Sequence, residues 1–257
     1  MNRTRTYFLS DLHLGANYIA DPRAHQQRVV TFLRSIEGDA KAVYLLGDVL
    51  DYWFEYRTVV PRGYVRFFGQ LARMADAGIK IVWFIGNHDI WLFDYLRDEI
   101  GIEIVDAPHG GIFREIDGVK FFLGHGDIFG RQPLGYRMLR VVFHNKLCQK
   151  LYAGLHPRWT LPFAHGWSSH SRKGSGQPPV PTLSGRARQS VMDECHRLCA
   201  ENPDLRFIVI GHHHVALDEQ VAPACRLIIL GNWINRSTYA VFDGQNLELK
   251  EFFEDEA

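Results

Sequence analysis

The chain has 257 residues, of which 46% are apolar and 23% charged, and its formal net charge is zero. This composition is ordinary for a globular protein and excludes a disordered chain, while the length allows one large domain or two small ones. No apolar run approaches the ~18 residues that a membrane span needs. The first residues lead directly into an apolar run rather than a signal peptide, so we expect a cytoplasmic protein.

Helical patterns occur at three places along the chain. Asp21 is suited to cap a helix that begins at Pro22, because Val29, Leu33 and Ile36 then repeat at helical spacing. The spacing of apolar residues predicts two further helices, over 63–78 and 185–203.

Short apolar runs alternate with these helices and predict buried strands. The runs cover 6–9, 42–46, 80–85, 102–105, 119–123, 206–210 and 226–230. Asp117 and Gly118 lie between two strand-like runs, which is typical of a hairpin, so a mixed sheet is expected. Strands that alternate with helices favour an α/β layered fold.

Side chains of the kinds that bind metal ions follow five of these strands directly. They are Asp11 and His13, Asp48, Asn87 with His88 and Asp89, His125 with Asp127, and His212, His213 and His214. In α/β sheets ligands bind outside the carboxyl ends of the strands, so these side chains should converge. A single Asp at such a place is more often a turn residue or a helix cap, but five coincidences favour a metal site.

The donor set contains oxygen and nitrogen ligands and no thiolate, which suits Mn²⁺, Fe²⁺, Zn²⁺ or Co²⁺ better than Ca²⁺ or a structural zinc. Glycine precedes four of the five groups and permits close backbone approach there, at Gly47, Gly86, Gly124 and Gly211. The triplet His212–His214 alone fits a solvated loop equally well. In an extended segment alternate residues face the same way, so His212 and His214 are expected at the metals and His213 elsewhere.

A 65-residue segment, 128–192, contains ten Lys or Arg and no Asp or Glu. Such charge segregation suggests a surface that meets anions. Within it, Leu139, Phe143, Leu147 and Leu151 repeat every four residues and predict one apolar helix face over 134–155, although simple core packing also explains them. A basic amphipathic segment with aromatic residues suits an anionic membrane surface. Candidates for binding substrate oxygens are Arg137, Arg140, Ser168, Ser169, Arg172 and Lys173.

The four cysteines have no zinc-type spacing, so free thiols are expected rather than disulfides.

The motifs SDLHLG, GDVLD, GNHD, HGD and GHHH, in this order, resemble those of the calcineurin-like metallophosphoesterase superfamily over residues 6–245. The resemblance implies an α/β fold with mixed sheets, a four-layer αββα sandwich, formed by one domain over 1–257 with two divalent metal ions. It implies that Asp11, His13 and His214 hold one ion and that Asn87, His125 and His212 hold the other, with Asp48 bridging. His88 would be catalytic, oriented by Asp89.

The GDVLDYWF region and the acid-free segment are similar to the UDP-2,3-diacylglucosamine diphosphatase family of lipid A biosynthesis. This resemblance implies a Mn²⁺ hydrolase that releases UMP and 2,3-diacylglucosamine 1-phosphate, with residues 129–181 as a basic amphipathic helical lid. It also implies a cytoplasmic protein bound peripherally to the inner membrane and no nucleic-acid partner. His88 departs from the family's Arg, and His213 from its Thr, so His88 is either a general acid or only a phosphate ligand.

Two other classes of function remain open. Another calcineurin-like phosphodiesterase or phosphatase would act on nucleotides, or a nuclease would use the basic segment to bind nucleic acid. The aromatic residues of that segment interleave with aliphatic ones at helical spacing, which favours lipid. A non-catalytic scaffold is expected least, because none of the seven ligands is missing.

Overall fold

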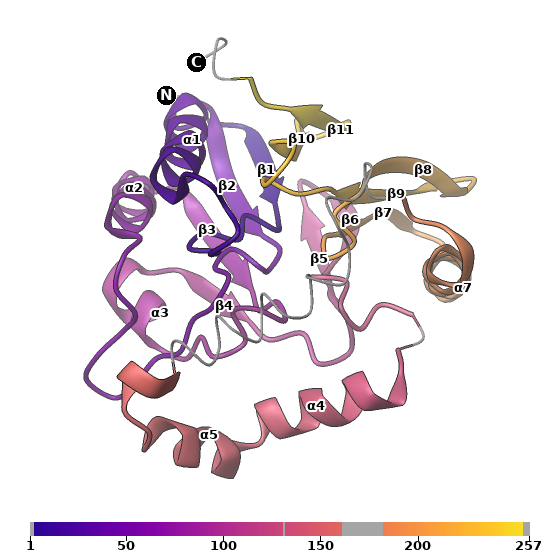
Figure 1. Ribbon diagram of the computed structural model, residues 1–257. Coiled ribbons are helices and arrows are strands. Elements are labelled where there is room, and N and C mark those ends of the chain that lie inside the picture. Colours follow the sequence, from indigo (N-terminus) through magenta and orange to yellow (C-terminus); the bar gives the residue numbers. More distant parts are fainter. Residues whose placement is uncertain (1–2, 131, 161–181, 254–257) are drawn as a thin grey trace.

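A computed structural model describes residues 3–130, 132–160 and 182–253 (Figure 1). One sheet has six strands in the order β11-β10-β1-β2-β3-β4 and the other has five in the order β5-β6-β7-β9-β8. The first contains β1 (Arg5–Leu9), β2 (Ala40–Leu45), β3 (Lys80–Phe84), β4 (Glu103–Val105), β10 (Thr238–Phe242) and β11 (Leu247–Glu251). The second contains β5 (Ile112–Ile116), β6 (Val119–Leu123), β7 (Leu205–Ile210), β8 (Ala216–Ala222) and β9 (Cys225–Leu230). Both sheets mix parallel and antiparallel pairs, as expected.

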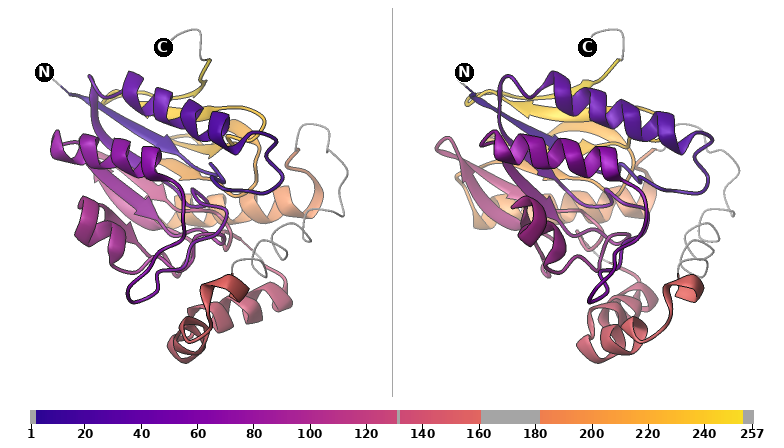
Figure 2. Two further views of the ribbon diagram at one scale, coloured as in Figure 1. Left: turned by 60° about the vertical axis from the view of Figure 1, so that its left-hand side comes forward. Right: turned by 90° about the vertical axis from the view of Figure 1, so that its left-hand side faces the viewer.

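Helices cover the outer faces of both sheets. The helices are α1 (Pro22–Ser35), α2 (Val65–Asp76), α3 (Tyr95–Ile100), α4 (Leu134–His144), α5 (Lys146–Ala153) and α7 (Gly185–Glu201). Figure 2 shows α1 and α2 side by side across one face of the molecule. Apolar side chains of α1, α2 and α3 pack with the first sheet, and those of α7 pack with the second.

Three buried apolar clusters separate the layers. Phe32, Phe67 and Trp83 belong to the cluster between the helices and the first sheet. A second cluster fills the space between the sheets, where Phe8 stacks on Phe121 with ring centroids 5.7 Å apart. The third lies between the second sheet and α7. These clusters confirm the four-layer αββα sandwich, since both faces of each sheet are covered by an apolar cluster.

Local sequence signals explain the ends of several elements. The Asp21 carboxylate accepts hydrogen bonds from the backbone N–H groups of Arg23 and Ala24 at 3.0 and 2.9 Å, which confirms the predicted helix cap. Asp117 and Gly118 both have positive φ, 52° and 76°, as the tight turn of the β5–β6 hairpin requires. All four cysteines are free thiols, also as expected.

The expected single helix over 134–155 is wrong, because the chain forms two helices that meet at Asn145. Asn145 has an extended backbone, with φ −70° and ψ 119°, and its side-chain oxygen accepts hydrogen bonds from the N–H groups of Leu147 and Cys148. The break splits the apolar stripe. Leu139 and Phe143 in the first half of the stripe are partly buried, whereas Leu147 and Leu151 are each 66% exposed.

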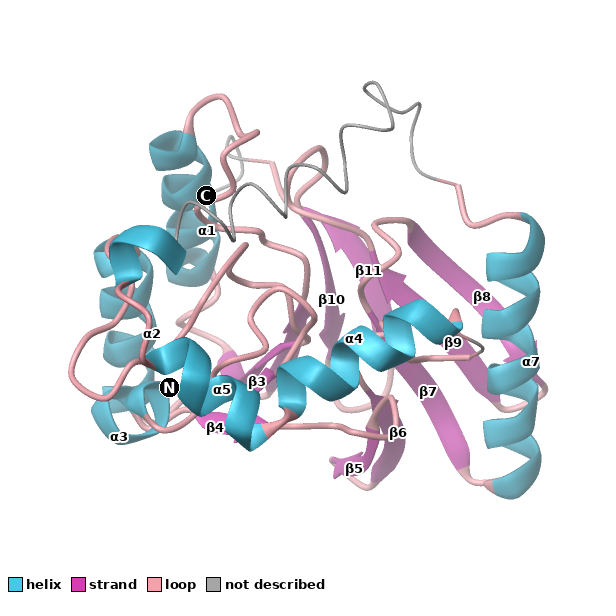
Figure 3. Cartoon of the chain, turned by 60° about the horizontal axis from the view of Figure 1, so that its bottom comes forward, coloured by secondary structure: helices cyan, strands magenta, loops and turns pink. Residues whose placement is uncertain are grey.

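A different apolar face of α4 is exposed. Leu134, Met138 and Val141 are 64–70% exposed and lie at helical spacing on one side. Figure 3 shows α4 and α5 as a separate pair of helices in front of the strands. Among the described residues, no helix is long and apolar enough to cross a membrane.

Candidate metal centre

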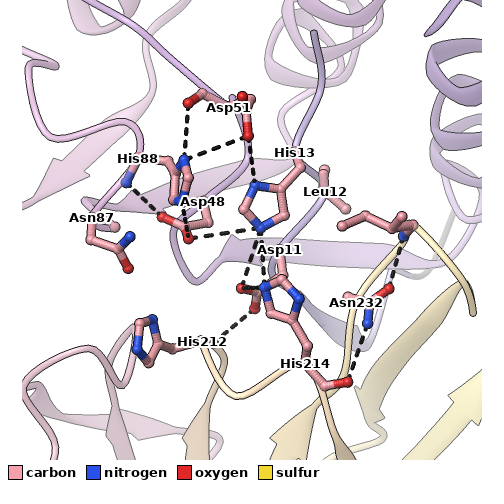
Figure 4. Close-up of polar contacts among 12 residues, drawn as sticks. Asp11, Leu12, His13, Asp48, Asp51, Asn87, His88, His212, His214 and Asn232 are labelled. Atoms are coloured by element: carbon pink, nitrogen blue, oxygen red, sulfur yellow. Dashed lines mark hydrogen bonds and ion pairs between the residues drawn. The ribbon is translucent and has the colours of Figure 1, made fainter. Parts of the chain in front are cut away.

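The predicted ligands come together where the two sheets meet (Figure 4). The loops after β1, β2 and β3 of the first sheet supply four of them, Asp11, His13, Asp48 and Asn87. The loops after β6 and β7 of the second sheet supply His125, His212 and His214. Residues from both sheets are therefore needed to complete the site.

One group of ligand atoms surrounds Asp11. His214 Nε2 lies 3.2 Å from Asp11 Oδ1 and also 3.2 Å from His13 Nε2. His13 Nε2 is 3.8 Å from a carboxylate oxygen of both Asp11 and Asp48. Asp11 Oδ1 is buried and accepts no hydrogen bond, which is rare for a buried carboxylate oxygen. Atoms spaced in this way fit around one ion, because ligands at about 2.1 Å from a metal lie about 3–4 Å from one another.

A second group surrounds His125. His125 Nε2 lies 3.0 Å from the Asn87 side-chain oxygen and 3.4 Å from Asp48 Oδ1. The His212 ring is 5.2 Å from the His125 ring, and atoms of Asp48, His125 and His212 lie within 4.8 Å of one another. Asp48 contributes one carboxylate oxygen toward each group, so it is placed to bridge two ions.

The second nitrogen of two of these histidines is held by an acceptor. His125 Nδ1 donates to the backbone carbonyl of Leu46 at 2.8 Å, and His13 Nδ1 lies 3.3 Å from Asp51 Oδ1. In the neutral form of each ring, these contacts leave the Nε2 lone pair facing the site. Metal-binding histidines in proteins almost always have such an arrangement, so the residues present fit a metal site.

The electrostatics favour the metal-binding form of several ligands. Burial would raise the pKa of the Asp11 and Asp48 carboxyls, but the neighbouring imidazoles outweigh it and hold both pKa values below their usual range. Burial and the nearby His125 lower the pKa of His212 to about 4. Ionised carboxylates and a neutral imidazole are the forms that coordinate a cation.

Five of the seven predicted ligands have positive φ, which non-glycine residues rarely adopt: Asp11 53°, His13 45°, Asp48 52°, His212 66° and His214 56°. Each such residue costs about 1–3 kcal/mol and persists only where surrounding contacts enforce it. The expectation of an extended segment at His212–His214 is therefore wrong. His212 and His214 nevertheless join different ligand groups, and no ligand group found among the described residues includes His213.

Glycine permits the close approach that the sequence suggests. A Cβ at Gly47 would lie 2.6 Å from His125 Nδ1, and one at Gly211 would lie 2.5 Å from Asp11 Oδ2. Any side chain at these two positions would displace a predicted metal ligand.

The acidic residue at Nδ1 of the His88 ring is Asp51, rather than the Asp89 expected from the sequence. The Asp51 carbonyl oxygen lies 3.0 Å and its Oδ1 lies 3.5 Å from His88 Nδ1. Asp89 is fully buried and accepts hydrogen bonds from the backbone N–H groups of Gly86 and Val49 and from the indole of Trp83. Burial and the Asp48 charge raise the pKa of Asp89 to about 6. Asp89 thus joins the loops after β2 and β3.

Sequence reasoning did not single out Asp51, although it is the last residue of the GDVLD motif.

Of the predicted substrate-binding residues, Arg137 is exposed on α4, and Arg140 forms an ion pair with Asp127 at 2.7 Å. Ser168, Ser169, Arg172 and Lys173 lie outside the described residues.

The fold and the site define a metalloenzyme built on a four-layer sandwich, with ligands for divalent metal ions supplied by both sheets. The chain belongs to the calcineurin-like phosphoesterase family, whose model matches residues 4–216. It is therefore a metal-dependent hydrolase.

Three named relatives cover 81–96% of this chain. A Porphyromonas gingivalis protein named UDP-2,3-diacylglucosamine hydrolase is 40% identical over 96% of this chain and 97% of its own length. Proteins of the same name from Ralstonia nicotianae and Nitrosococcus oceani are 24% and 25% identical, over 81% and 89% of this chain and 76% and 87% of their own lengths.

Proposed function

We propose that this protein hydrolyses the diphosphate of UDP-2,3-diacylglucosamine and releases UMP and 2,3-diacylglucosamine 1-phosphate, a step of lipid A biosynthesis. The full-length similarity to proteins named for this substrate supports the proposal. The structural observation that carries it is the pair α4 and α5, which exposes large apolar side chains while it contacts the loops of the metal site. A substrate that joins a diphosphate to two acyl chains needs both surfaces.

Two ions, for which we propose Mn²⁺, would share the Asp48 carboxylate. One would be held by Asp11, His13 and His214, and the other by Asn87, His125 and His212. An oxygen and nitrogen donor set of this kind accepts Mn²⁺, Fe²⁺, Zn²⁺ or Co²⁺. Bound there, divalent ions supply Lewis acidity and lower the pKa of a coordinated water toward neutrality.

His88 would donate a hydrogen bond to the scissile phosphate. A carbonyl oxygen only accepts, so the contact with Asp51 keeps the proton on Nδ1. His88 Nε2 then faces the site, 3.9 Å from Asp48 Oδ2, and would donate from there as an imidazolium, with a proton on each ring nitrogen. A phosphate leaving group is a weak base and hardly needs a proton, so protonated His88 acts on a phosphoryl oxygen rather than as an obligatory acid. Asp89 supports this role by fixing the loop that carries His88.

The insertion, residues 129–181, would act as a lid over the acyl chains and as the contact with the cytoplasmic face of the inner membrane. Exposed apolar residues of α4 and α5 lie beside exposed cations, among them Arg137, Lys146 and Lys150. At such a surface, apolar burial in the membrane interface and attraction to anionic lipid both contribute to the free energy of membrane binding. The protein would then take its substrate from the membrane as a peripheral protein.

A substrate panel with purified protein and Mn²⁺ tests the proposal. UDP-2,3-diacylglucosamine is compared with its deacylated counterpart and with nucleotide phosphodiesters. We expect UMP from the diacylated substrate at a much higher kcat/KM than from the others. Rapid turnover of nucleotide phosphodiesters with the diacylated substrate untouched would show that the protein is a different phosphoesterase.

A further inference from the structure

Asp127 connects the metal site to helix α4. It lies two residues beyond the ligand His125, and its side chain is only 5% exposed. Its Oδ2 accepts a hydrogen bond from the Tyr136 hydroxyl at 2.8 Å and from Arg140 Nη1 at 2.7 Å. Within the described part of the chain, the Asp127 carboxylate has two side-chain donors, and both come from α4.

Tyr136 and Arg140 are one helical turn apart, so they lie on the same face of α4. Leu139 and Phe143 are partly buried beside them, whereas Leu134 and Met138 are exposed. The face with the two donors therefore points to the body of the protein. Apolar contacts alone would let a short helix slide, but hydrogen bonds to one buried carboxylate fix its position along and around its axis.

The other end of α4 meets a second ligand-bearing loop. Trp91, which follows Asn87 and His88, donates its indole N–H to the backbone carbonyl of Phe143 at 3.1 Å. Its ring contacts the Phe143 ring at 5.3 Å and stacks on Tyr152 of α5 at 5.2 Å. Both ends of α4 thus rest on loops that carry metal ligands.

We propose that Asp127 is a positioning residue, which holds α4 in register with the metal site through Arg140 and Tyr136 and so adapts the enzyme to substrates that carry acyl chains. The substrate part of this inference rests on the proposed function, while the positioning of α4 does not. A diacylated substrate must engage the phosphoryl site and α4 together, and a displacement of about 1 Å is enough to cost about 100-fold in rate. A small phosphodiester engages the metal site alone.

The first test is hydrogen–deuterium exchange of the substrate-free protein with Mn²⁺ bound. Asp127→Asn and Arg140→Gln should each raise exchange over 134–144, and Arg140→Lys should restore much of the protection. The matched control is Arg66→Gln, which removes the same charge from an exposed position on α2. If Arg140 acted only by contacting substrate, its replacement would not change exchange in the substrate-free protein. Unchanged exchange in both variants therefore overturns the proposal.

The second test compares kcat/KM for UDP-2,3-diacylglucosamine and for bis(4-nitrophenyl) phosphate, with metal content measured on the same samples. Arg140→Gln and Tyr136→Phe should lower the ratio of the two values, Arg140→Gln by about tenfold or more. Arg140→Gln should lower this ratio little further when Asp127→Asn is already present, because the effects of replacing two residues that contact each other are not additive. Additive losses, or equal losses on both substrates, overturn the assignment. If the wild type leaves the diacylated substrate untouched, the proposed function fails while the exchange experiment still decides the role of Asp127.

Discussion

The carboxylate of Asp51 lies between two histidine rings, with Oδ1 3.3 Å from His13 Nδ1 and 3.5 Å from His88 Nδ1. One side chain therefore orients a predicted metal ligand and the candidate phosphate donor together. The Asp51 side chain is fully buried, so both contacts persist without competition from water.

Asp51→Ala should lower activity and weaken metal binding by about 10–100-fold, the usual effect of removing the partner of a metal-bound histidine. The reason is that the His13 and His88 rings lose the acceptor that sets their orientation. Metal titration followed by single-turnover kinetics at saturating Mn²⁺ separates the two effects. Full affinity and full rate in this variant would remove Asp51 from the site.

Asp48→Ala should abolish both turnover and the binding of two equivalents of metal, because the carboxylate supplies an oxygen to each ligand group. Elemental analysis after dialysis against Mn²⁺ checks the stoichiometry. Glu219→Ala, remote from the ligand groups on β8, is the control for loss of a carboxylate. Two equivalents of metal with normal turnover in Asp48→Ala would mean that the ions bind elsewhere.

The histidine triplet allows a comparison between neighbours. His212→Gln should lower metal stoichiometry and activity strongly, since the His212 ring faces the His125 group. His213→Gln should keep both metals and most activity, because His213 belongs to no ligand group found in the described residues. Metal analysis and kcat measured on both variants test this difference. Equal losses of bound metal and of kcat in the two variants would make His213 a ligand.

His25 should make the folded state sensitive to acid. Burial lowers the pKa of His25, whose Nε2 donates to the Leu12 carbonyl at 2.7 Å. Leu12 lies between the predicted ligands Asp11 and His13 in sequence. The unfolded chain then binds more protons than the folded one as the pH falls below about 6.5, so the free energy of unfolding decreases there. Urea unfolding in EDTA between about pH 5 and pH 7 measures this slope, which should be smaller in His25→Gln. An identical slope in both proteins would exclude His25 as its source.

Membrane binding should depend on the exposed face of α4. Met138→Glu combined with Val141→Glu should lower partitioning onto phosphatidylglycerol vesicles by at least about tenfold, because two apolar side chains can no longer enter the interface. Val65→Glu on α2, at a residue that is 79% exposed, is the matched control. Vesicle sedimentation gives the bound fraction, and equal binding of all variants would exclude α4 as the membrane contact.

Apolar runs were enough to predict most of the buried strands, because such runs must lie between layers. The ordered motifs likewise indicated the seven residues that the structure brings together. The edge strands β8 and β11 were missed, since their outward residues are polar and leave no apolar run; β11, for example, reads Leu-Glu-Leu-Lys-Glu. The inner strand β10, which reads Thr-Tyr-Ala-Val-Phe, was missed as well. An edge strand is defined by its neighbour rather than by its own composition.

The remaining errors arose where local sequence does not determine side-chain partners. The acidic residue next to His88 in sequence is Asp89, but left-handed turns bring Asp51 to its ring instead. The helix break at Asn145 was hidden because the apolar spacing continues through it. A side-chain cap competes there with helix continuation, and tertiary contacts of α4 and α5 decide the outcome.

Each ligand group takes residues from both sheets, and this has a thermodynamic consequence. Ions bound there cross-link the two halves of the sandwich and bind the folded chain in preference to the unfolded one. At a free ion concentration 100 times the dissociation constant, one such site adds about 2.7 kcal/mol to the free energy of unfolding. Metal supply would then determine the lifetime of the folded chain as well as the rate of the reaction, so starvation for the ion would expose the chain to proteolysis while it also slowed the reaction.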